Sequence, residues 1–295
     1  MMTTRRTFLI GTTALLGAGI SAPQVFAGPL ENLKDRISRI EAKVEGRLGV
    51  AVLDTGSGRS FGYRENERFP MCSTFKLMAA AAILKRVEQK QETLEWRVHF
   101  TKSDLVTYSP VTEKHIESGM TVAELCEAAI TLSDNTAGNL MLAMLGGPSG
   151  VTAFARALGD PLTRLDRTEP TLNEAVPGDV RDTTTPAAMA ENLQKLIFGH
   201  ALAKASSAQL QAWLLANKTG DARLRARLPS GWRVGDKTGS GERGSTNDIG
   251  ILWPPDSAPI IVAAYLTETA APADKRNAAL AEVGDAAATD LRPRS

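Results

Sequence analysis

The sequence predicts two domains: an α/β domain formed by both ends of the chain and a helical domain inserted between them. Strand patterns occur at 47–63 and again at 232–267. Helical periodicity dominates the segment between them, and a helical pattern also lies at each end of the mature chain. The boundaries we predict are 28–65 together with 218–295 for the α/β domain, and 66–217 for the helical domain. Clefts between two such halves are favoured ligand sites.

The first half of the mature chain combines one pair of strands with several helices. Residues 32–46 carry apolar residues at helical spacing, and 47–63 are typical of two strands joined by a Gly-Ser turn. Residues 73–87 are apolar on nearly every side, which is typical of a helix buried in the middle of a domain. Further helices are predicted at 121–132, 135–145 and 149–158.

The second half contains a long aperiodic loop and then returns to strands. Residues 164–182 are polar and contain proline, and loops of this length in compact domains are often functional. Helices are predicted at 184–198 and 206–220, and a last helix begins near residue 273. Three consecutive strands joined by short turns are predicted at 232–240, 246–255 and 259–267.

The composition is that of an ordinary globular protein. The chain has 295 residues, of which 43% are hydrophobic and 23% are charged, and its formal net charge is +1. This balance gives no reason to expect a nucleic-acid partner. His99, His115 and His200 lack the spacing of metal ligands, so no metal or other cofactor is expected. No heptad or internal repeat indicates assembly, so we expect a monomer.

Residues 1–27 have the features of an export signal. Arg5 and Arg6 precede Thr-Phe-Leu, an apolar run follows, and Val25 and Ala27 satisfy the small-residue rule of a cleavage site. The paired arginines are typical of twin-arginine export. The apolar run is short for a membrane span, with an uncleaved anchor as the alternative. We therefore predict cleavage near Ala27, a periplasmic protein and no stable membrane association.

The triplet Lys-Thr-Gly occurs twice, and the two copies have different settings. Lys218 lies at the predicted end of a helix, where a cation complements the helix dipole. Gly220 suits the left-handed position that often follows a helix. This copy is therefore expected to be a helix stop signal. Lys237 lies on a predicted strand, so the second copy is the candidate for chemistry.

Ser73 begins the motif Ser-Thr-Phe-Lys, which places Lys76 three residues later on the same face of a helix. A serine hydroxyl is a weak nucleophile until a neighbouring base takes its proton, and a buried lysine with a lowered pKa can act as that base. A helix N-terminus also favours an oxyanion. The pair alone is equally compatible with an ordinary helix start followed by a lysine, because Ser-x-x-Lys is a common pattern.

The tripeptide Ser133-Asp134-Asn135 lies in the break between two predicted helices, where catalytic side chains are often found. The alternative is a helix cap, because Ser, Asp and Asn are preferred N-cap residues. The order of motifs favours the first interpretation. Ser-x-x-Lys, then Ser-Asp-Asn, then a strand-borne Lys-Thr-Gly is an established signature of serine enzymes that react with penicillins.

With these motifs in place, the chain resembles the class A β-lactamases over essentially the whole mature sequence. The segments YSPVTEKHI, RLDRTEPTLNEA, RDTTTP and GDKTGSG carry the resemblance. It implies an α/β plus all-α fold like that of penicillin-binding proteins, with a five-stranded antiparallel sheet flanked by helices and an inserted helical domain. It also implies hydrolysis of β-lactam antibiotics, and hence antibiotic resistance.

The resemblance further implies roles for individual residues. Ser73 would open the β-lactam ring, Ser133 would protonate the leaving nitrogen, and a water activated by Glu169 would release the product. Whether Lys76 or Glu169 takes the Ser73 proton stays open. Backbone amides of Ser73 and Ser240 would form the oxyanion hole. The implied catalytic residues are Ser73, Lys76, Ser133, Glu169 and Lys237, and the implied substrate-binding residues are Tyr108, Asn135, Asn173, Thr238, Gly239, Ser240 and Arg223.

Two further features of the family are expected in the 164–182 loop, and one departure concerns its substrate site. Arg167 and Asp182 would pair across the neck of the loop, and the Glu169–Pro170 bond would be cis. Thr246 stands where many members carry an arginine that helps to bind the substrate carboxylate. Arg223 occupies the position of a substitute arginine in other members, and we expect it to reach toward Thr238.

The cysteines also depart from the family pattern. The common disulfide partner of Cys126 falls at Ala80, and the position that bridges to Cys72 in carbapenem-hydrolysing relatives is Gly241. Two free thiols are therefore expected. Cys72, Ser240 and the segment TNDI resemble members that are active on oxyimino-cephalosporins.

Two alternatives use the same three motifs. A penicillin-binding peptidase cuts D-Ala-D-Ala, and a β-lactam sensor domain is acylated and stays acylated. Both should lack the Glu169–Asn173 pair, because release of the acyl group needs a base beside a held water. The presence of that pair favours the hydrolase.

Overall fold

The computed structural model describes residues 29–290, so the predicted signal at 1–27 lies outside the described residues. A five-stranded antiparallel sheet has the order β2-β1-β9-β8-β7. Its strands come from the two ends of the chain, as predicted, and every neighbouring pair is joined by a ladder of backbone hydrogen bonds. The strands are β1 (Arg47–Asp54), β2 (Ser60–Tyr63), β7 (Arg233–Ser240), β8 (Thr246–Trp253) and β9 (Ile260–Thr267).

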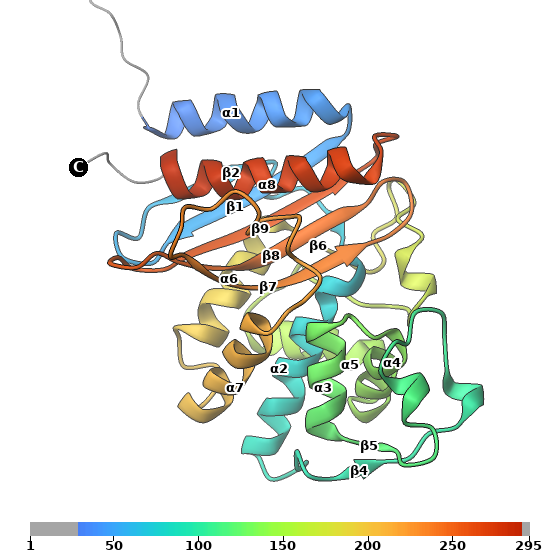
Figure 1. Cartoon of the computed structure of the whole chain (residues 1–295). Helices are drawn as coiled ribbons and strands as arrows, with labels where there is room; N and C mark the ends of the chain where they lie inside the picture. The colour runs from blue at the N-terminus through green and yellow to red at the C-terminus, as the bar shows by residue number, and fades with distance from the viewer. Residues whose placement is uncertain (1–28, 291–295) are drawn as a thin grey trace, which may run out of the picture.

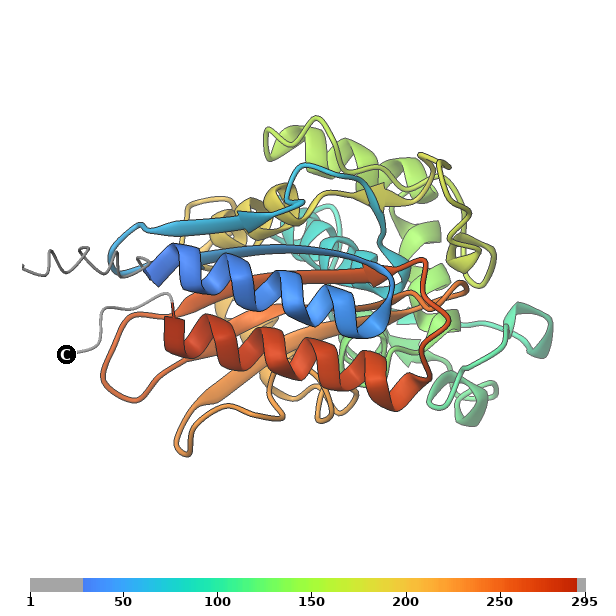
Figure 2. The same cartoon turned by 90° about the horizontal axis from the view of Figure 1, so that it is seen from above.

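Helices α1 (Pro29–Val44) and α8 (Ala273–Asp290) lie side by side over one face of the sheet (Figures 1 and 2). The side chains of β9 alternate between two cores, because successive residues of a strand point to opposite faces. Val262 belongs to the core beneath α1 and α8, whereas Ala263 and Tyr265 belong to the core shared with the other helices. The sheet is therefore buried on both faces.

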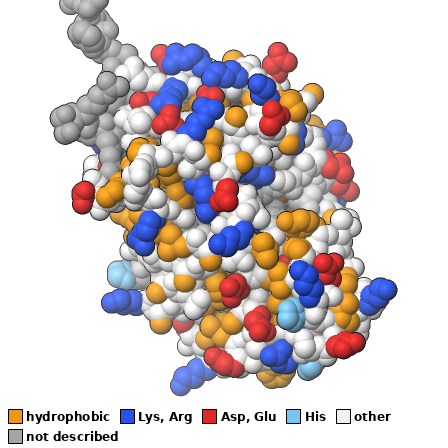
Figure 3. Space-filling model, viewed as in Figure 1, with side chains coloured by type: hydrophobic (Ala, Val, Ile, Leu, Met, Phe, Trp, Pro, Cys, Tyr) orange, Lys and Arg blue, Asp and Glu red, His pale blue; other side chains and the backbone are white. Residues whose placement is uncertain are grey.

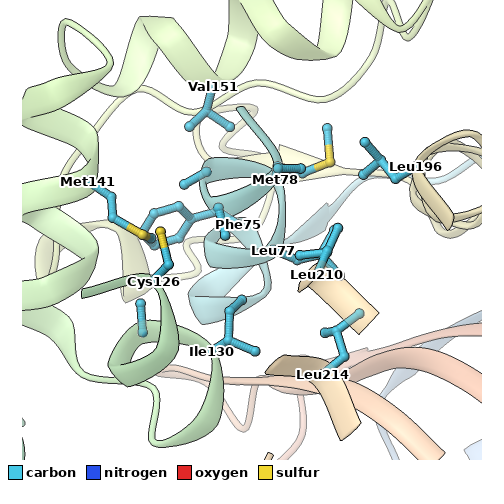
Figure 4. Packing of buried hydrophobic residues seen from close by; sticks show 14 of the residues in the cluster. Phe75, Leu77, Met78, Cys126, Ile130, Met141, Val151, Leu196, Leu210 and Leu214 are labelled. Atoms are coloured by element: carbon cyan, nitrogen blue, oxygen red, sulfur yellow. The ribbon is translucent and has the colours of Figure 1, made fainter. Parts of the chain in front are cut away.

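The other helices form a body below the sheet in Figure 1. Helix α2 runs through its middle, and ten consecutive residues from Phe75 to Leu84 are buried. Figure 4 shows Phe75, Leu77 and Met78 of α2 surrounded by apolar side chains of the neighbouring helices. Each fully buried side chain of this size contributes about 1.5–3 kcal/mol. The helices are α2 (Phe75–Glu88), α3 (Val122–Thr131), α4 (Asn135–Met144), α5 (Pro148–Ala157), α6 (Pro186–Ile197) and α7 (Lys204–Leu215).

Short elements complete the fold. Two-stranded ribbons are formed by β3 (Phe69–Pro70) with β6 (Thr183–Thr184) and by β4 (Arg97–Val98) with β5 (Met120–Thr121). Single turns of 3-10 helix are η1 (Cys72–Thr74), η2 (Lys102–Asp104), η3 (Thr112–Lys114) and η4 (Thr171–Asn173). The β3–β6 ribbon places the start of α2 beside the end of the long 164–182 loop. Within 29–290, no helix is long and apolar enough to cross a membrane.

The fold class predicted from the sequence is confirmed, whereas one detail is wrong. Helix α7 ends at Leu215, so Lys218 does not lie in its last turn. Gly220 is not among the residues with positive φ. It is needed for another reason: a Cβ at this position would lie 2.2 Å from Oδ2 of Asp236. The side chain of Asn217 turns the chain early, because its Oδ1 accepts from the amide of Thr219 at 3.0 Å. The domain boundaries at 65/66 and 217/218 stay a prediction.

Candidate active site

Ser73 lies in η1, immediately before α2. The segment before it is anchored by Asn247 of β8, whose Nδ2 donates to the carbonyl oxygens of Pro70 at 2.9 Å and Met71 at 3.1 Å. Strand β7 also passes close to this turn, since a Cβ on Gly239 would lie 2.8 Å from the Met71 oxygen. The missing side chain of glycine permits this approach of two backbones. The sheet therefore sets the position of Ser73.

The Nζ of Lys76 is buried and surrounded by oxygen atoms. It donates to Oγ of Ser73 at 2.9 Å and lies 3.0 Å from Oε1 of Glu169. It also donates to the carbonyl oxygen of Ser133 at 2.9 Å and to Oδ1 of Asn135 at 2.7 Å. These acceptors compensate the amine for its loss of water.

Burial changes the acid–base properties of both lysines of the site. The pKa of Lys76 is lowered by burial, although the neighbouring Glu169 carboxylate acts in the opposite direction. The pKa of Lys237 is lowered well below its usual value because the side chain is buried and lies near Lys76 and Arg223. Both amines therefore release a proton more readily than a solvated lysine, which suits them to proton transfer.

Ser133 lies between these two lysines. Its Oγ accepts from Nζ of Lys237 at 3.0 Å, and Nζ of Lys76 is 3.5 Å away. Ser133 has a φ of 58°, which turns the chain between α3 and α4. The next residue, Asp134, caps α4 by accepting from the amide of Ala137 at 2.8 Å. The tripeptide is therefore both a helix start and part of the site, so the two interpretations of its sequence are compatible.

Asn135 uses both ends of its side-chain amide inside the protein. Oδ1 accepts from Lys76, and Nδ2 donates to the carbonyl oxygen of Thr107 at 2.8 Å. Its backbone amide donates to the carbonyl oxygen of Tyr108 at 3.0 Å. Tyr108 has a φ of 67° and is 56% exposed. The ring of Tyr108 is thus open to solvent, while its backbone is held by the residue that contacts Lys76.

Glu169 reaches Ser73 from the long loop. The hydroxyl of Ser73 donates to Oε1 of Glu169 at 2.9 Å, and Oε2 accepts from Nδ2 of Asn173. Asn139 of α4 holds the backbone of Glu169 from both sides, because its amide group bonds the Glu169 carbonyl oxygen and the Glu169 N–H, each at 2.9 Å. Within the described chain, the buried Oδ1 of Asn173 has no hydrogen-bond partner.

The neck of the loop is closed by an ion pair. Nε of Arg167 lies 2.6 Å from Oδ2 of Asp182. The other carboxylate oxygen of Asp182 accepts from the backbone amides of Asp166 at 2.8 Å and Arg167 at 2.9 Å. The predicted pairing across the neck is confirmed, and the Glu169–Pro170 bond is cis as expected. The buried Asp182 therefore ties both ends of the loop that carries Glu169.

Arg223 meets strand β7 at a different residue from the one predicted. Its guanidinium donates to the carbonyl oxygen of Gly239 at 2.9 Å and to Oγ of Ser240 at 2.7 Å. No bond to Thr238 is formed, because the Thr238 hydroxyl lies 2.6 Å from the hydroxyl of Thr219. The expected contact with Thr238 is therefore wrong. Arg223 binds the next two residues of the same strand, Gly239 and Ser240.

Three residues around the site were not found by the sequence analysis: Asn139, Thr219 and Asn247. Asn139 had a detectable signal, because it lies four residues after Asn135 and so on the same face of α4. Thr219 belongs to the Lys-Thr-Gly copy that was assigned to a helix stop, and Asn247 belongs to the segment TNDI, for which no contact was predicted. The contacts of Thr219 and Asn247 join segments that are distant along the chain, so local patterns do not reveal them.

Both cysteines are buried free thiols, as predicted. Burial raises the pKa of Cys126 to about 12, and the pKa of Cys72 is raised as well, by burial and by the Glu169 charge. Thiols in such surroundings are poor nucleophiles. Cys72 is next to Ser73 in sequence, yet the serine hydroxyl is the group in contact with the amine and the carboxylate.

The site brings together a hydroxyl, a carboxylate, two amines and a second hydroxyl, all from residues singled out in the sequence. A serine in hydrogen-bond contact with a base is the arrangement of an activated nucleophile. Proton donors and acceptors on its other side suit the protonation of a leaving group. Within 29–290, no cluster of three or more His, Cys, Asp or Glu side chains is placed to hold a metal ion.

Comparisons with known proteins agree with this chemistry. Residues 32–291 match the beta-lactamase enzyme family. Beta-lactamase OXY-1 of Klebsiella oxytoca is 50% identical over 273 residues, covering 91% of this chain and 94% of that protein. Beta-lactamase Toho-1 of Escherichia coli is 53% identical over 250 residues, covering 85% of this chain and 86% of that protein.

Solved structures give the same result. An ancestral class A β-lactamase has a TM-score of 0.85 and 63% identity, and covers 86% of this chain and 98% of that chain. The putative class A β-lactamase PenP from Rhodopseudomonas palustris has a TM-score of 0.85 and 62% identity, with the same coverage. The family match, the identity of the relatives and the shared fold agree with the serine-based site, and the chain belongs to the class A serine β-lactamase family.

Proposed function

We propose that this hydrolase opens the amide bond of penicillins and cephalosporins through an acyl-enzyme on Ser73, which a water activated by Glu169 then releases. One observation carries the proposal: the Ser73 hydroxyl lies 2.9 Å both from the Glu169 carboxylate and from the Lys76 amine. A nucleophile is thereby in contact with a general base and with a group that can relay protons. The biological consequence is resistance to β-lactam antibiotics.

In the first step, Oγ of Ser73 attacks the lactam carbonyl and loses its proton. In the free enzyme this hydroxyl donates to Glu169, while the amine of Lys76 donates to the hydroxyl. The direction of these bonds favours Glu169 as the group that accepts the proton. The backbone amides of Ser73 and Ser240 stabilise the developing oxyanion, and each such donor is worth about 3–4 kcal/mol in related sites.

The lactam nitrogen must receive a proton when its bond to carbon breaks. Ser133 supplies this proton, because its hydroxyl lies on the hydrogen-bonded chain between Lys237 and Lys76. The lowered pKa of both amines makes them effective donors to Ser133. Ser133 is then reprotonated from Lys76. Lys76 in turn takes the proton that Glu169 accepted from Ser73, across 3.0 Å, so Glu169 is again a carboxylate when deacylation begins.

Release of the acyl group needs a water that attacks the ester. Glu169 and Asn173 hold this water. Their side chains are hydrogen-bonded to each other, and Oδ1 of Asn173 is a buried acceptor without a partner among the described residues. Asn139 keeps Glu169 in place through its backbone. A carboxylate fixed in this way acts as the base for deacylation.

Substrate binding is assigned to the edge strand β7 and its neighbours. Lys237, Thr238 and Ser240 bind the carboxylate that penicillins and cephalosporins share, and Arg223 supplies a further positive charge next to Ser240. Backbone groups at Gly239 and the amide of Asn135 orient the substrate side chain. The ring of Tyr108, which is open to solvent, forms a wall of the cleft.

The remaining expectations concern partners and location. On the face seen in Figure 3, basic and acidic side chains are interspersed, which supports a protein without a nucleic-acid partner. The sequence of residues 1–27 supports twin-arginine export to the periplasm with cleavage near Ala27. We propose a monomer that is not stably bound to membranes and that needs no cofactor.

A D-Ala-D-Ala peptidase or a β-lactam sensor is the alternative that shares the three motifs. The test counts turnovers of a chromogenic cephalosporin by the mature protein, by Glu169→Gln and by Ser73→Ala. We expect many turnovers by the wild type. Glu169→Gln should deacylate about 10²–10⁴-fold more slowly and accumulate one acyl group on Ser73, visible by mass spectrometry. Ser73→Ala should form no adduct. A single stoichiometric burst from the wild type itself would establish the peptidase or the sensor instead.

A further inference from the structure

We propose that Asp248 carries a proton in the working enzyme, and that its neutral carboxyl group holds the segment bearing Arg223 while leaving the Arg223 charge available to substrate. Asp248 would be a positioning residue, since it acts through Arg223. The inference about its effect on substrate binding rests on the proposed function of the site. The inference about its protonation does not, because it can be tested without substrate.

Asp248 lies on β8 and is completely buried. One carboxyl oxygen, Oδ2, accepts from the backbone amide of Leu224 at 3.1 Å. The other, Oδ1, is buried and has no hydrogen-bond partner among the described residues. A buried carboxylate with an unpaired oxygen costs far more than a buried neutral carboxyl group. The bond to Leu224 needs only the oxygen that a protonated group keeps, so it survives protonation.

A second carboxyl group lies nearby on the same face of the sheet. Asp236 stands opposite Gly250 and Asp248 stands opposite Thr238, so the two aspartates are diagonal neighbours on β7 and β8. Both carboxyl oxygens of Asp236 are used as acceptors: Nε of Arg225 donates to Oδ2 at 3.1 Å, and Oδ1 accepts from the same guanidinium and from Asn217. Arg225 is therefore already paired with Asp236.

The charges around Asp248 act in both directions. Burial and the Asp236 charge raise the pKa of Asp248 well above its usual value, while Arg223, Arg225 and the Leu224 amide oppose this and do not prevail. On the other face of the sheet, burial, Lys76 and Arg223 lower the pKa of Lys237, although the Asp236 charge opposes them. Helix α8 contributes Arg276, which donates to Oγ1 of Thr246 at 2.9 Å.

Arg223 itself has no carboxylate partner within the described part of the chain. Its guanidinium donates to carbonyl oxygens of Gly239 at 2.9 Å and Asn247 at 2.7 Å, to Oγ of Ser240 at 2.7 Å and to Oδ1 of Asn277 at 3.0 Å. All four acceptors are neutral. If Asp248 were ionised, its negative charge would neutralise part of the positive charge of Arg223. With Asp248 protonated, the carboxylate of a substrate is the first to compensate Arg223.

The competing interpretation is that Asp248 is ionised and serves as the counter-ion of Arg223. The two interpretations predict opposite pH effects. A carboxyl whose folded pKa is raised lowers the stability of the fold as pH rises from its unfolded pKa of about 3.9 toward the folded value. An ionised counter-ion would instead add stability above its pKa and lose it in acid. Replacement by asparagine, which imitates the protonated group, separates them.

The experiment measures thermal unfolding between pH 4 and pH 9 for the mature wild type, Asp248→Asn and Asp248→Ala. We expect Asp248→Asn to be more stable than the wild type at neutral pH. The ratio of the wild-type unfolding constant to that of the variant should grow about tenfold per pH unit until the folded pKa of Asp248 is reached. Infrared spectra should show a protonated carboxyl band that Asp248→Asn lacks. The proposal would be overturned if the difference in stability between Asp248→Asn and the wild type were constant with pH. It would also be overturned if Asp248→Asn were less stable than the wild type at neutral pH.

Two further measurements complete the test. The KM of Asp248→Asn for a penicillin should stay within about twofold of the wild type, whereas Asp248→Ala, which loses the bond to Leu224, should raise KM without a matching fall in kcat. A KM that rises equally in both variants contradicts the neutral carboxyl. Asp236→Asn is the matched control, and it should be less stable than the wild type at neutral pH because it breaks the pair with Arg225. If the protein proves inactive on β-lactams, the unfolding data still decide the protonation of Asp248.

Discussion

Nζ of Lys237 lies 3.0 Å from Oγ of Ser133, and this bond joins the edge strand of the sheet to the loop between two helices of the other part of the molecule. Ser133 is also 3.5 Å from Nζ of Lys76. The second Lys-Thr-Gly triplet thus meets the Ser-Asp-Asn tripeptide at one hydroxyl. Replacing any of the three side chains should disturb the same proton path.

We first predict a pH effect for Lys237. Its pKa is lowered well below the usual value by burial, by Lys76 and by Arg223. The positive charge that binds a substrate carboxylate should therefore be lost at a lower pH than for a solvated lysine, and kcat/KM should fall on the alkaline side. Lys237→Arg keeps its charge, so this fall should move to higher pH. Lys237→Ala should lower kcat/KM about 10–100-fold.

Steady-state rates between pH 6 and pH 10 check this prediction. The control is the acidic side of the profile, which should be unchanged in Lys237→Arg because other groups determine it. The assignment is wrong if the arginine variant and the wild type lose activity at the same alkaline pH.

The second prediction concerns the neck of the 164–182 loop. Arg167→Ala leaves the buried Asp182 without its cation, which should cost about 3 kcal/mol and lower Tm by about 6–12 °C. Glu169 lies on this loop, so deacylation should slow as well. The matched control is Arg181→Ala, because Arg181 pairs with Asp179 at 2.7 Å but is half exposed. Calorimetry should find Tm unchanged in the control. Equal losses in both variants would show that the neck has no special role.

The third prediction is a new disulfide. A Cβ on Gly241 would lie 2.7 Å from Sγ of Cys72 and 2.8 Å from the carbonyl oxygen of Asn173, so a small local shift should bring two sulfur atoms within bonding reach here. Gly241→Cys should therefore form a disulfide with Cys72 on mild oxidation. Thiol titration of the unfolded protein should then find one free thiol, that of Cys126. Three reactive thiols would refute the geometry, and adding Cys72→Ser should abolish the bridge.

The fourth prediction concerns Arg223. Its bonds to Gly239 and Ser240 place its charge beside the strand that receives substrate. Arg223→Ala should raise KM about tenfold or more for a substrate with a free carboxylate, because a charge-assisted hydrogen bond contributes about 1.5–3 kcal/mol. For the methyl ester of the same substrate, the change should be much smaller. A KM that rises equally for the acid and the ester would mean that Arg223 only supports the strand.

Several parts of the site could be predicted from local sequence. The spacing of Ser73 and Lys76 corresponds to one turn of helix, so their contact at 2.9 Å follows from helical geometry. Ser133, Asp134 and Asn135 are short polar residues at a helix start, where their positions are set by capping. Glu169 and Asn173 lie four residues apart on one loop and are joined by a hydrogen bond, whereas their joint action on a water stays a prediction.

Other contacts could not be predicted, because they depend on tertiary packing. The end of α7 was predicted too far along the chain, since the side chain of Asn217 turns the chain only once Asp236 is there to bond it. Arg223 was expected near Thr238, but the hydroxyl of Thr219 occupies that place. Neither partner is near in sequence, so no periodicity reveals the competition between them.

The sequence alone determined the class of fold, the order of the motifs and the family, because helical spacing, strand alternation and caps are local properties of the chain. Only the tertiary structure decided which distant groups meet. It places Lys237 beside Ser133, pairs Asp182 with Arg167 at the neck of the loop, and buries Asp248 beside Asp236. The reason is physical: burial and long-range contacts set the charges of these groups, and both exist only after the sheet and the helices have packed together.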